Sequence, residues 1–444
     1  MSHIAGTLAS GAASRALTEE IAAYTERNPR SFERYSAATS VMPGGNTRSV
    51  LYYDPFPLSI SRGEGCRVWD ADGHEYIDLL GEFTAAVYGH SDPSIRAAIV
   101  SALERGINLS GHNLFEAELA RLVCERFPSI DLVRFTNSGT EANLMALAAA
   151  VAFTGRRKIL VFDGAYHGGV LSFTSGPSRV NVPHEFLVST YNDVDRTVHL
   201  IEAHGEELAA ILVEPMLGTG CIPAAPEFLL ALRRAATDHG VLLIFDEVIT
   251  SRLAPGGRQQ ALDIIPDVTT LGKYVGGGMS FGAFGGRTDV MQQFDPRRAG
   301  ALPHAGTFNN NVVTMSAGVT GLTKVFTPAA AESLNARGDV VRTRLNTLCR
   351  EHGASFQFAG IGSLMSAHAT ARPIRAPSDA AHGDATVTAL FFFDMLNRGL
   401  YLARRGFIAL SLHIGDAEVD RLVDAVRDFL EMRRDLVCGA VPRR

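Results

Sequence analysis

The chain has 444 residues, 46% of them hydrophobic and 20% charged, and its net charge is −6. This composition is ordinary for a globular protein with a large core, and it gives no basic surface for nucleic-acid binding. No run of about 18 apolar residues predicts a membrane-spanning helix, and the N-terminus lacks the basic start and apolar core of a signal peptide.

The N-terminal region is expected to begin with helix. Residues 1–40 favour helix, interrupted at Pro29 because proline cannot continue one. Residues 41–57 are rich in turn-forming residues and then in aromatic ones, which is typical of a loop that covers a site. Residues 66–80 predict a hairpin, because the Asp-Gly pair that starts at Asp72 is a strong turn signal.

From about residue 90 to 320, short apolar strands alternate with helices. Strands are predicted over 132–138, 158–164, 209–215 and 241–248, and helices over 93–106, 114–127, 140–155 and 226–240. This alternation predicts βαβ units and therefore an α/β fold with a mostly parallel central sheet. After that the pattern changes to long helices around short strands, as in a smaller α+β domain. The expected division is 1–65 (N-terminal segment, part of the small domain), 66–320 (large domain) and 321–444 (C-terminal small domain).

Ligands of parallel sheets gather at the carboxyl ends of the strands, and four strand ends here carry polar or glycine-rich loops. Their sequences are NSGT, GAYHGG, EPMLGTG and DEVITS. In the first loop, Ser138, Gly139 and Thr140 open a helix, whose free N–H groups and dipole attract an anion. They are candidate phosphate ligands, although simple N-capping explains the same pattern. No GK[ST] follows as in a P-loop.

Asp246 ends a strongly apolar strand and is followed by Glu247. A buried carboxylate costs several kcal/mol unless it is paired. Asp246 therefore either caps a loop or joins a salt bridge, or it holds a cationic nitrogen of a ligand. Glu247 is equally compatible with a solvated position and with packing against a loop.

Lys273 lies between apolar residues and glycines in the segment TLGKYVGGGMSFGAFGG. A single lysine is ordinarily a solvated charge, but burial lowers the pKa of the amine and frees it as a nucleophile for carbonyl groups. The glycines do not indicate a dinucleotide-binding loop, because no strand-GxGxxG-helix pattern with a later acid is present. Tyr166, beside His167 at another strand end, offers an aromatic face to a flat ligand or is simply a core residue.

Together these features match the requirements of pyridoxal 5′-phosphate (PLP). This cofactor needs a phosphate site, an aromatic plate, an acid for its ring nitrogen and a lysine that forms a Schiff base. Asp246 would keep the ring nitrogen protonated, and Lys273 would hold the aldehyde and later move a proton.

The same residues resemble those of the fold type I PLP enzymes, specifically the class III aminotransferases. The matching segments follow the order of that family over nearly the whole chain and are 137–142, 164–169, 213–216, 242–250, 269–286 and 304–311. Within the class, the sequence is similar to the glutamate-1-semialdehyde aminomutase branch, and there to the β-phenylalanine aminotransferases. The segments that carry this closer resemblance are 43–58, 107–116, 251–257, 306–312 and 404–412.

The resemblance implies a role for each matching residue. Lys273 would carry the cofactor, and Asp246 would bind its ring nitrogen. The remaining cofactor residues would be Ser138, Gly139 and Thr140 at the phosphate, Val248 and Tyr166 on the two ring faces, Glu214 near the 3-hydroxyl group, and Thr307 at the phosphate of the other subunit. This last role implies a homodimer with shared active sites.

Substrate carboxylates call for arginine, whose planar fork binds them in a bidentate manner. The resemblance makes Arg48 the main carboxylate anchor. It makes Arg405 a second, more mobile arginine that helps to accept 2-oxoglutarate. From the residues alone, both would be read as surface charges. Tyr88 is expected to line the pocket.

The implied activity is a ping-pong transamination of a β-amino acid similar to β-phenylalanine, with 2-oxoglutarate or pyruvate as acceptor. Two alternatives stay within enzymes, namely a glutamate-1-semialdehyde aminomutase and a transaminase of ω-amino acids or amines. Two others are a catalytically silent PLP-binding protein and a plain nucleotide-binding protein.

The cysteines bear on the compartment. They are five, scattered and without a CxxC pair, so neither a disulfide framework nor a metal site is expected, and a reducing cytoplasm fits. The expected partners are the small-molecule amino donor and acceptor, with no nucleic acid and no membrane.

Overall fold

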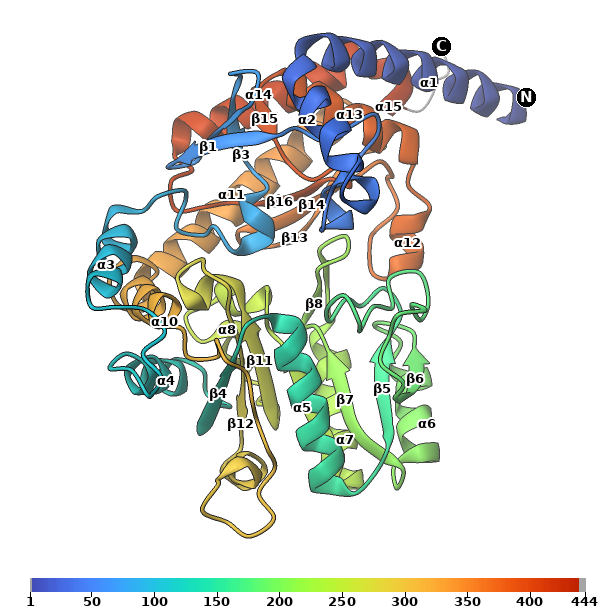
Figure 1. Cartoon of the computed structure of the whole chain (residues 1–444). Helices are drawn as coiled ribbons and strands as arrows, with labels where there is room; N and C mark the ends of the chain where they lie inside the picture. Colours follow the sequence, from blue (N-terminus) through green and yellow to red (C-terminus); the bar gives the residue numbers. More distant parts are fainter. Residues whose placement is uncertain (1, 439–444) are drawn as a thin grey trace.

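The structure, a computed structural model, describes residues 2–438 (Figure 1). Its central sheet has seven strands in the order β4-β12-β11-β10-β7-β5-β6. Their bounds are β4 Leu132–Thr136, β5 Lys158–Phe162, β6 Glu185–Ser189, β7 Leu208–Val213, β10 Leu242–Asp246, β11 Val268–Gly272 and β12 Gly282–Gly286. Neighbouring strands are parallel except where β12 pairs with β11 and β4. The predicted α/β fold with a mostly parallel sheet is confirmed.

Helices cover this sheet, as the βα alternation predicts. The helix α5 (Gly139–Thr154) follows β4 directly and packs on β7, β11 and β12, while α7 (Pro226–His239) precedes β10 and packs on it. The helix α6 (Val194–His204) follows β6 and packs on α7. Every residue of β7, β10, β11 and β12 is buried, which is what a sheet covered on both faces requires.

The sequence pattern does not predict β6, β11 or β12. The last of these is GAFGG, and glycine is unfavourable inside a strand because it has no side chain to pack. The structure shows why glycine is needed there. A Cβ atom on Gly282 would lie 2.0 Å from the carbonyl oxygen of Ser138, and one on Gly286 would lie 2.2 Å from that of Asp267.

Two smaller sheets lie beyond the central one, in the orders β1-β2-β3-β15 and β13-β14-β16, with a two-stranded β8-β9 ribbon. The remaining strands are β1 Ile60–Glu64, β2 Arg67–Asp70, β3 Glu75–Asp78, β8 Met216–Leu217, β9 Ile222–Pro223, β13 Gln357–Ile361, β14 Leu364–His368, β15 Leu400–Tyr401 and β16 Phe407–Ala409. The remaining helices are α1 Ser2–Arg27, α2 Pro29–Thr39, α3 Pro93–Glu104, α4 Glu116–Arg126, α8 Gly257–Leu262, α9 Thr288–Met291, α10 Val312–Thr320, α11 Pro328–Glu351, α12 Pro377–Ala381, α13 Ala385–Asn397, α14 Asp416–Met432 and α15 Arg434–Val437. Short turns of other helix types include η2 Ser49–Leu51, η3 Gly81–Thr84 and η5 Lys273–Gly276, besides η1 Pro43–Gly45, η4 Thr250–Leu253, η6 Gln292–Phe294 and η7 Gly321–Val325.

The N-terminal and C-terminal parts of the chain pair in one of the smaller sheets. The strand β3 pairs with β2 on one side and in parallel with β15 on the other, with Leu400 opposite Ile77 and Tyr401 opposite Asp78. The predicted hairpin over 66–80 is therefore confirmed as β2 and β3. Its residues hydrogen-bond to the C-terminal part of the chain, although the predicted division assigns them to the large domain. The division itself stays a prediction.

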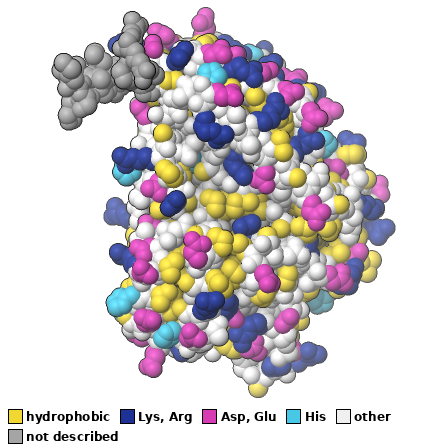
Figure 2. Space-filling view, turned by 180° about the vertical axis from the view of Figure 1, so that it is seen from behind, with side chains coloured by type: hydrophobic (Ala, Val, Ile, Leu, Met, Phe, Trp, Pro, Cys, Tyr) yellow, Lys and Arg dark blue, Asp and Glu magenta, His cyan; other side chains and the backbone are white. Residues whose placement is uncertain are grey.

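The surface carries charges of both signs. Figure 2 shows Lys and Arg side chains intermixed with Asp and Glu on the face seen from behind, with hydrophobic side chains gathered across its middle. This face therefore presents no broad field of one sign, in keeping with the modest net charge of −6. Among residues 2–438, no helix combines the length and the apolar composition that crossing a bilayer would require.

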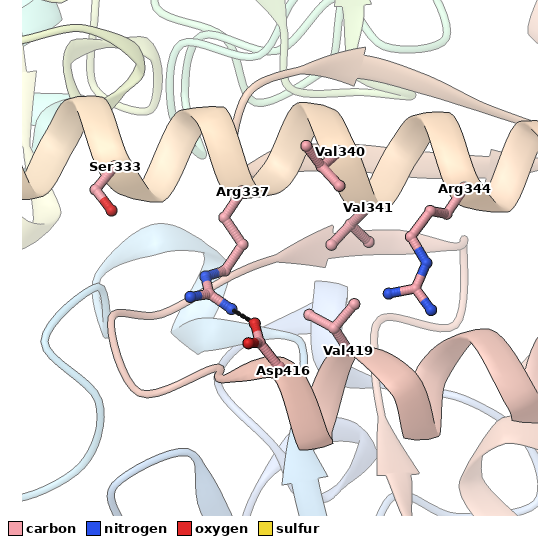
Figure 3. Close-up of a pocket in the computed structure, with 7 residues that line it drawn as sticks. All are labelled: Ser333, Arg337, Val340, Val341, Arg344, Asp416 and Val419. Atoms are coloured by element: carbon pink, nitrogen blue, oxygen red, sulfur yellow. Dashed lines mark hydrogen bonds and ion pairs between the residues drawn. The ribbon is translucent and has the colours of Figure 1, made fainter.

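A shallow groove of about 250 Å³ lies between α11 and α14 (Figure 3). Its lining residues are Ser333, Arg337, Val340, Val341, Arg344, Asp416 and Val419. Both of its arginines already have partners, since Arg337 pairs with Asp416 and Arg344 lies 2.8 Å from Asp420. None of the predicted site residues lines this groove.

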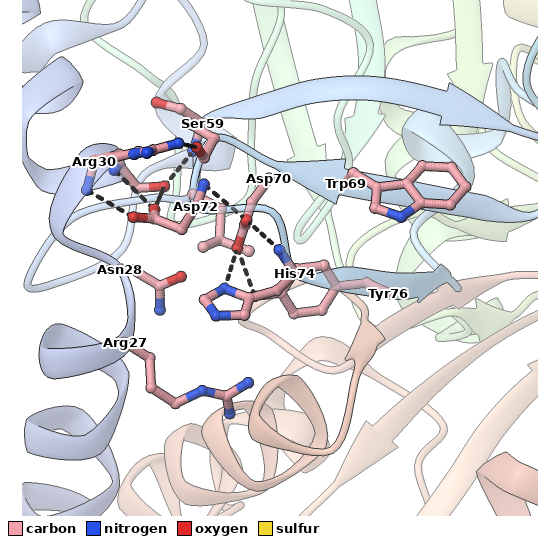
Figure 4. Close-up of polar contacts among 12 residues, drawn as sticks. Arg27, Asn28, Arg30, Ser59, Trp69, Asp70, Asp72, His74 and Tyr76 are labelled. Carbon is pink, nitrogen blue, oxygen red and sulfur yellow. Dashed lines mark hydrogen bonds and ion pairs between the residues drawn. The ribbon is translucent and has the colours of Figure 1, made fainter.

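The helix α2 is fastened to the hairpin by the carboxylate of Asp72 (Figure 4). The predicted break at Pro29 is confirmed as the boundary between α1 and α2. The first N–H groups of α2, from Arg30 and Ser31, donate to Asp72 at 2.7 and 3.0 Å. Asp70 accepts from the backbone and the ring of His74 within the turn. The hairpin thus supplies the cap that α2 lacks from its own sequence.

Candidate active site

Asp246 lies at the carboxyl end of β10, in a network of buried polar groups. Its Oδ2 atom accepts from Asn143 Nδ2 and lies 2.8 Å from His167 Nδ1, and its Oδ1 atom accepts from the N–H of Val248 at 3.0 Å. Thr270 donates to Asn143 Oδ1 at 2.7 Å. These donors stabilise a carboxylate that is only 3% exposed, and Oδ1 retains capacity for a further donor.

Sequence reasoning missed the partners of Asp246. The sequence marks His167 only as a neighbour of Tyr166, and no motif marks Asn143, which lies one turn into α5. The structure buries both side chains. His167 Nε2 has no hydrogen-bond partner within residues 2–438. The one sequence signal for these partners of Asp246 is that His167 stands at the end of a neighbouring predicted strand.

Glu247 does not share this environment, although it is the next residue. It is fully buried and accepts from the N–H groups of Arg258 at 2.7 Å and Gln259 at 3.0 Å, and from the hydroxyl of Thr250. Burial raises the pKa of its carboxyl group. The sequence leaves Glu247 either solvated or packed against a loop, and the structure shows it packed, where it holds the start of α8. Of these two acids, only Asp246 faces the site.

The NSGT loop before α5 provides both a helix cap and free N–H groups for an anion, which are the two possibilities that the sequence leaves open. Ser138 caps the helix, since its Oγ accepts from the N–H of Glu141 at 3.1 Å. The N–H groups of Gly139 and Thr140 have no acceptor within the described part of the chain, so they remain available to an anion. A Cβ atom on Gly139 would lie 2.8 Å from a methyl group of Val248, which places Val248 against this loop.

Lys273 follows β11 in the left-handed backbone region, with φ of 56°. Its Nζ donates to the carbonyl oxygen of Phe83 at 2.7 Å. Burial lowers the pKa of the amine to about 8, and the cations Arg405 and Arg48 add to this effect. The carboxylates Asp246 and Glu214 oppose it. The structure therefore brings these four predicted site residues together around one amine.

Glu214 follows β7 and is buried beside the same group. Its carboxyl oxygens accept from the N–H groups of Tyr166 and Gly218, both at 2.9 Å. Burial raises the pKa of this carboxyl group to about 7, and the nearby charge of Asp246 adds to the effect. The ring of Tyr166 remains 52% exposed at this strand end. It is therefore free to face a ligand and is not a core residue.

The two predicted carboxylate-binding arginines approach the site from outside the central sheet. Arg48 is the residue before η2, and it pairs with Glu82. Arg405 follows β15 and makes no ion pair or hydrogen bond within residues 2–438, although its guanidinium carbon lies 5.3 Å from the centroid of the Phe83 ring.

Two predicted residues are not brought to this group. Tyr88 is buried, and its hydroxyl donates to the carbonyl oxygen of Tyr274 at 2.8 Å. Its ring packs against Phe326 and Gly321, so its polar atom faces protein and does not line a pocket. Thr307 is exposed in the segment between β12 and α10 and has no hydrogen-bond partner within the described residues.

Comparison with known proteins bears on what this arrangement does. The family model for aminotransferase class-III matches residues 51–430. The chain is 58% identical over 417 residues to a β-phenylalanine transaminase from Variovorax paradoxus, covering 94% of this chain and 96% of that protein. It is 36% identical to a glutamate-1-semialdehyde 2,1-aminomutase from Desulforamulus reducens, covering 89% and 96%. A crystal structure of a β-phenylalanine aminotransferase from Variovorax paradoxus superposes with a TM-score of 0.95 at 56% identity, covering 97% of this chain and 100% of that one.

Proposed function

Because this chain belongs to the class-III aminotransferases, it is a PLP-dependent aminotransferase, and we propose that its amino donor is a β-amino acid similar to β-phenylalanine. The acceptor would be an oxoacid, 2-oxoglutarate or pyruvate. The observation that carries this proposal is the 58% identity, over 94% of the chain, to a protein described as a β-phenylalanine transaminase.

The residues at the site fit PLP. The unpaired N–H groups at the start of α5, beside Ser138, suit its phosphate. The carboxylate of Asp246, with capacity left on Oδ1, suits a protonated ring nitrogen. Val248 and the exposed ring of Tyr166 would bound the two faces of a flat ligand. Glu214 would lie near the 3-hydroxyl group. When bound, PLP supplies an electrophilic aldehyde and an electron-withdrawing ring.

Lys273 is the base in the proposed mechanism. With its pKa lowered to about 8, a substantial fraction of the amine is unprotonated near neutral pH. Its Nζ would remove the proton from the carbon that bears the amino group of the substrate and deliver a proton to the cofactor in the same half-reaction. The acceptor half-reaction would run this transfer in reverse. The Asp246 carboxylate is held in place by Asn143 and His167, and it would stabilise positive charge opposite it.

Arg48 explains how a β-amino acid would fit. The carboxylate of such a substrate lies one carbon further from the reacting amine than that of an α-amino acid, so its anchor belongs on a different wall of the pocket. Arg48 is on the loop before η2, outside the central sheet, yet close enough to Lys273 to lower the pKa of its amine. Arg405 would bind the second carboxylate of 2-oxoglutarate.

The proposal is tested by the visible spectrum of the purified enzyme. Addition of 3-amino-3-phenylpropionate without any oxoacid should bleach the absorption band of the bound cofactor, and 2-oxoglutarate should restore it. A band that α- or ω-amino donors bleach, but that this β-amino acid leaves unchanged, would contradict the substrate assignment. A band that glutamate-1-semialdehyde alone affects would favour the aminomutase activity.

We also propose that the enzyme is a homodimer in which Thr307 reaches the phosphate site of the partner. In support, Thr307 is exposed, and large apolar side chains around it and in the loop between α3 and α4 are exposed too. These are Ile107, Leu109, Leu114 and Phe308, with exposed fractions of 52%, 49%, 82% and 55%. Exposed apolar groups of this kind mark interaction surfaces.

Light scattering should give twice the mass of the chain for the purified enzyme. Thr307→Val should weaken PLP binding, measured as cofactor retained after dialysis, without changing that mass. Thr323→Val, which removes the hydroxyl of an exposed threonine in η7 that donates to the carbonyl oxygen of Val319, is the control and should retain cofactor normally. A monomeric enzyme with full activity would contradict the shared site.

The compartment is part of the same proposal. All five cysteines are free, and Cys66, Cys221 and Cys349 are buried. An enzyme with this set of thiols suits a reducing compartment such as the cytoplasm.

A further inference from the structure

One phenylalanine lies beside every cation of the site. The ring centroid of Phe83 is 5.9 Å from the guanidinium carbon of Arg48 and 5.3 Å from that of Arg405. The backbone carbonyl of the same residue accepts from Lys273 Nζ. Phe83 is 8% exposed and packs in an apolar cluster with Phe407. Its ring and its carbonyl oxygen therefore both present negative partial charge to positive groups.

The fold explains why these groups meet. The strands β3 and β15 pair in parallel, so the segments that follow them leave the same edge of that sheet. The segment after β3 contains Phe83, and the segment after β15 contains Arg405. The proximity of Phe83 and Arg405 cannot be predicted from the sequence, because more than 300 residues separate these two positions.

The backbone of η3 is unusual. Gly81, Glu82, Phe83 and Thr84 all have positive φ, at 56°, 48°, 50° and 84°. For the three residues with side chains, this left-handed region is unfavourable, and it persists only where the surrounding structure holds it. Such strain concentrates at functional sites. Here it accompanies a residue whose ring and carbonyl oxygen both contact the site.

The arginines need a support that leaves their N–H groups free. Glu82 occupies one nitrogen of Arg48, and Arg405 has no acidic partner within residues 2–438. An aromatic face attracts the flat side of a guanidinium, so the N–H edges remain available for a carboxylate. A second acidic partner, added to the one that Glu82 provides at a single nitrogen of Arg48, would occupy those edges and compete with the substrate.

We propose that Phe83 is a positioning residue that supports both carboxylate-binding arginines on one ring, and thereby sets the affinity for the amino donor and for the oxoacid together. The proposal rests on the proposed function, because it takes Arg48 and Arg405 as the carboxylate sites of the two substrates.

The chain offers a matched control. Phe407 lies 5.7 Å from Phe83, ring to ring, and its centroid is 6.0 Å from Arg405, but it has no such contact with Arg48. Phe83→Leu should therefore affect both arginines, and Phe407→Leu only one. Leucine is preferred to valine at position 83, because a β-branched residue would add strain at φ of 50°. Phe83→Tyr keeps the ring and should behave as wild type.

The experiment measures binding of two unreactive carboxylates to the holoenzyme by calorimetry. 3-Phenylpropionate lacks the amine of the donor, and glutarate lacks the keto group of the acceptor. Phe83→Leu should raise the dissociation constants of both by about two- to five-fold, the usual size of an exposed cation–π contact. Phe407→Leu should raise that of glutarate alone. If Phe83→Leu fails to fold, Phe83→Met provides the same measurement.

The outcomes separate the two proposals. If Arg48→Gln and Arg405→Gln weaken binding, but Phe83→Leu and Phe83→Met bind both ligands as wild type does, the role of Phe83 is overturned and the proposed function stands. The same holds if Phe83→Leu affects glutarate alone. If wild type binds neither carboxylate, or the arginine variants bind both normally, the proposed substrate site fails first.

Discussion

Lys273→Ala should abolish turnover, with less than about 10⁻³ of the wild-type rate remaining, because the variant lacks both the nucleophilic amine and the base. The result of this substitution is easy to interpret, because few other lysines could replace Lys273. It contains only three lysines, at 158, 273 and 324. Lys158 is paired with Glu207 at 2.7 Å, and Lys324 is exposed in η7. Lys273 alone of the three lies at the site.

The measurement has two parts. The rate of the amino-donor half-reaction is followed in wild type and in the variant, with Lys324→Ala as control. Borohydride treatment of wild type should then fix the cofactor to the peptide that contains Lys273, as read by mass spectrometry, and should fix none in the variant. The variant should still bind PLP noncovalently. Normal turnover of Lys273→Ala, or cofactor fixed to Lys158 or Lys324, would remove the assignment.

Asp246→Asn should keep the fold and lower the rate by on the order of 10²-fold or more. Asparagine cannot stabilise a protonated ring nitrogen as a carboxylate does, while its volume is nearly the same. His167 can present either ring nitrogen as donor or acceptor, so the network around position 246 can adapt. The melting temperature and the half-reaction rate are measured together.

Glu247→Gln is the matched control for Asp246→Asn. Its carboxyl group is equally buried but faces the start of α8. We expect this variant to lose stability and to keep its half-reaction rate once folded. If Asp246→Asn were nearly as active as wild type, Asp246 would have no electrostatic role in catalysis.

Local sequence patterns predicted the fold well where strands are apolar and end in polar loops. The strand that ends at Asp246 is of this kind. They failed at β12, because the glycines in that strand are required by the close approach of neighbouring backbone, as at Gly282, and not by strand propensity. The spacing of residue types along the sequence carries no information about how closely neighbouring backbones pack.

The site shows the same limit. Lys273 and Asp246 stood out because an isolated charge in an apolar or glycine-rich segment needs an explanation. The partners of Asp246 did not stand out, since Asn143 is 103 residues away and reaches it through a helix that begins at another strand. Tyr88 is expected to line the pocket, but its hydroxyl is satisfied by a backbone carbonyl in the core.

The pairing of β3 with β15 has a consequence for synthesis of the chain. While the ribosome is still translating the central part, the hairpin of β2 and β3 is complete, but one edge of β3 lacks its neighbour until residues 400 and 401 emerge. Unpaired strand edges invite association between nascent chains. A chain that terminates before Leu400 therefore lacks β15, and the edge of β3 stays unpaired in every such truncated protein. Slow translation of the last part of the message should therefore reduce the yield of this enzyme more than slow translation of the first part. A shortage of chaperones should increase this loss.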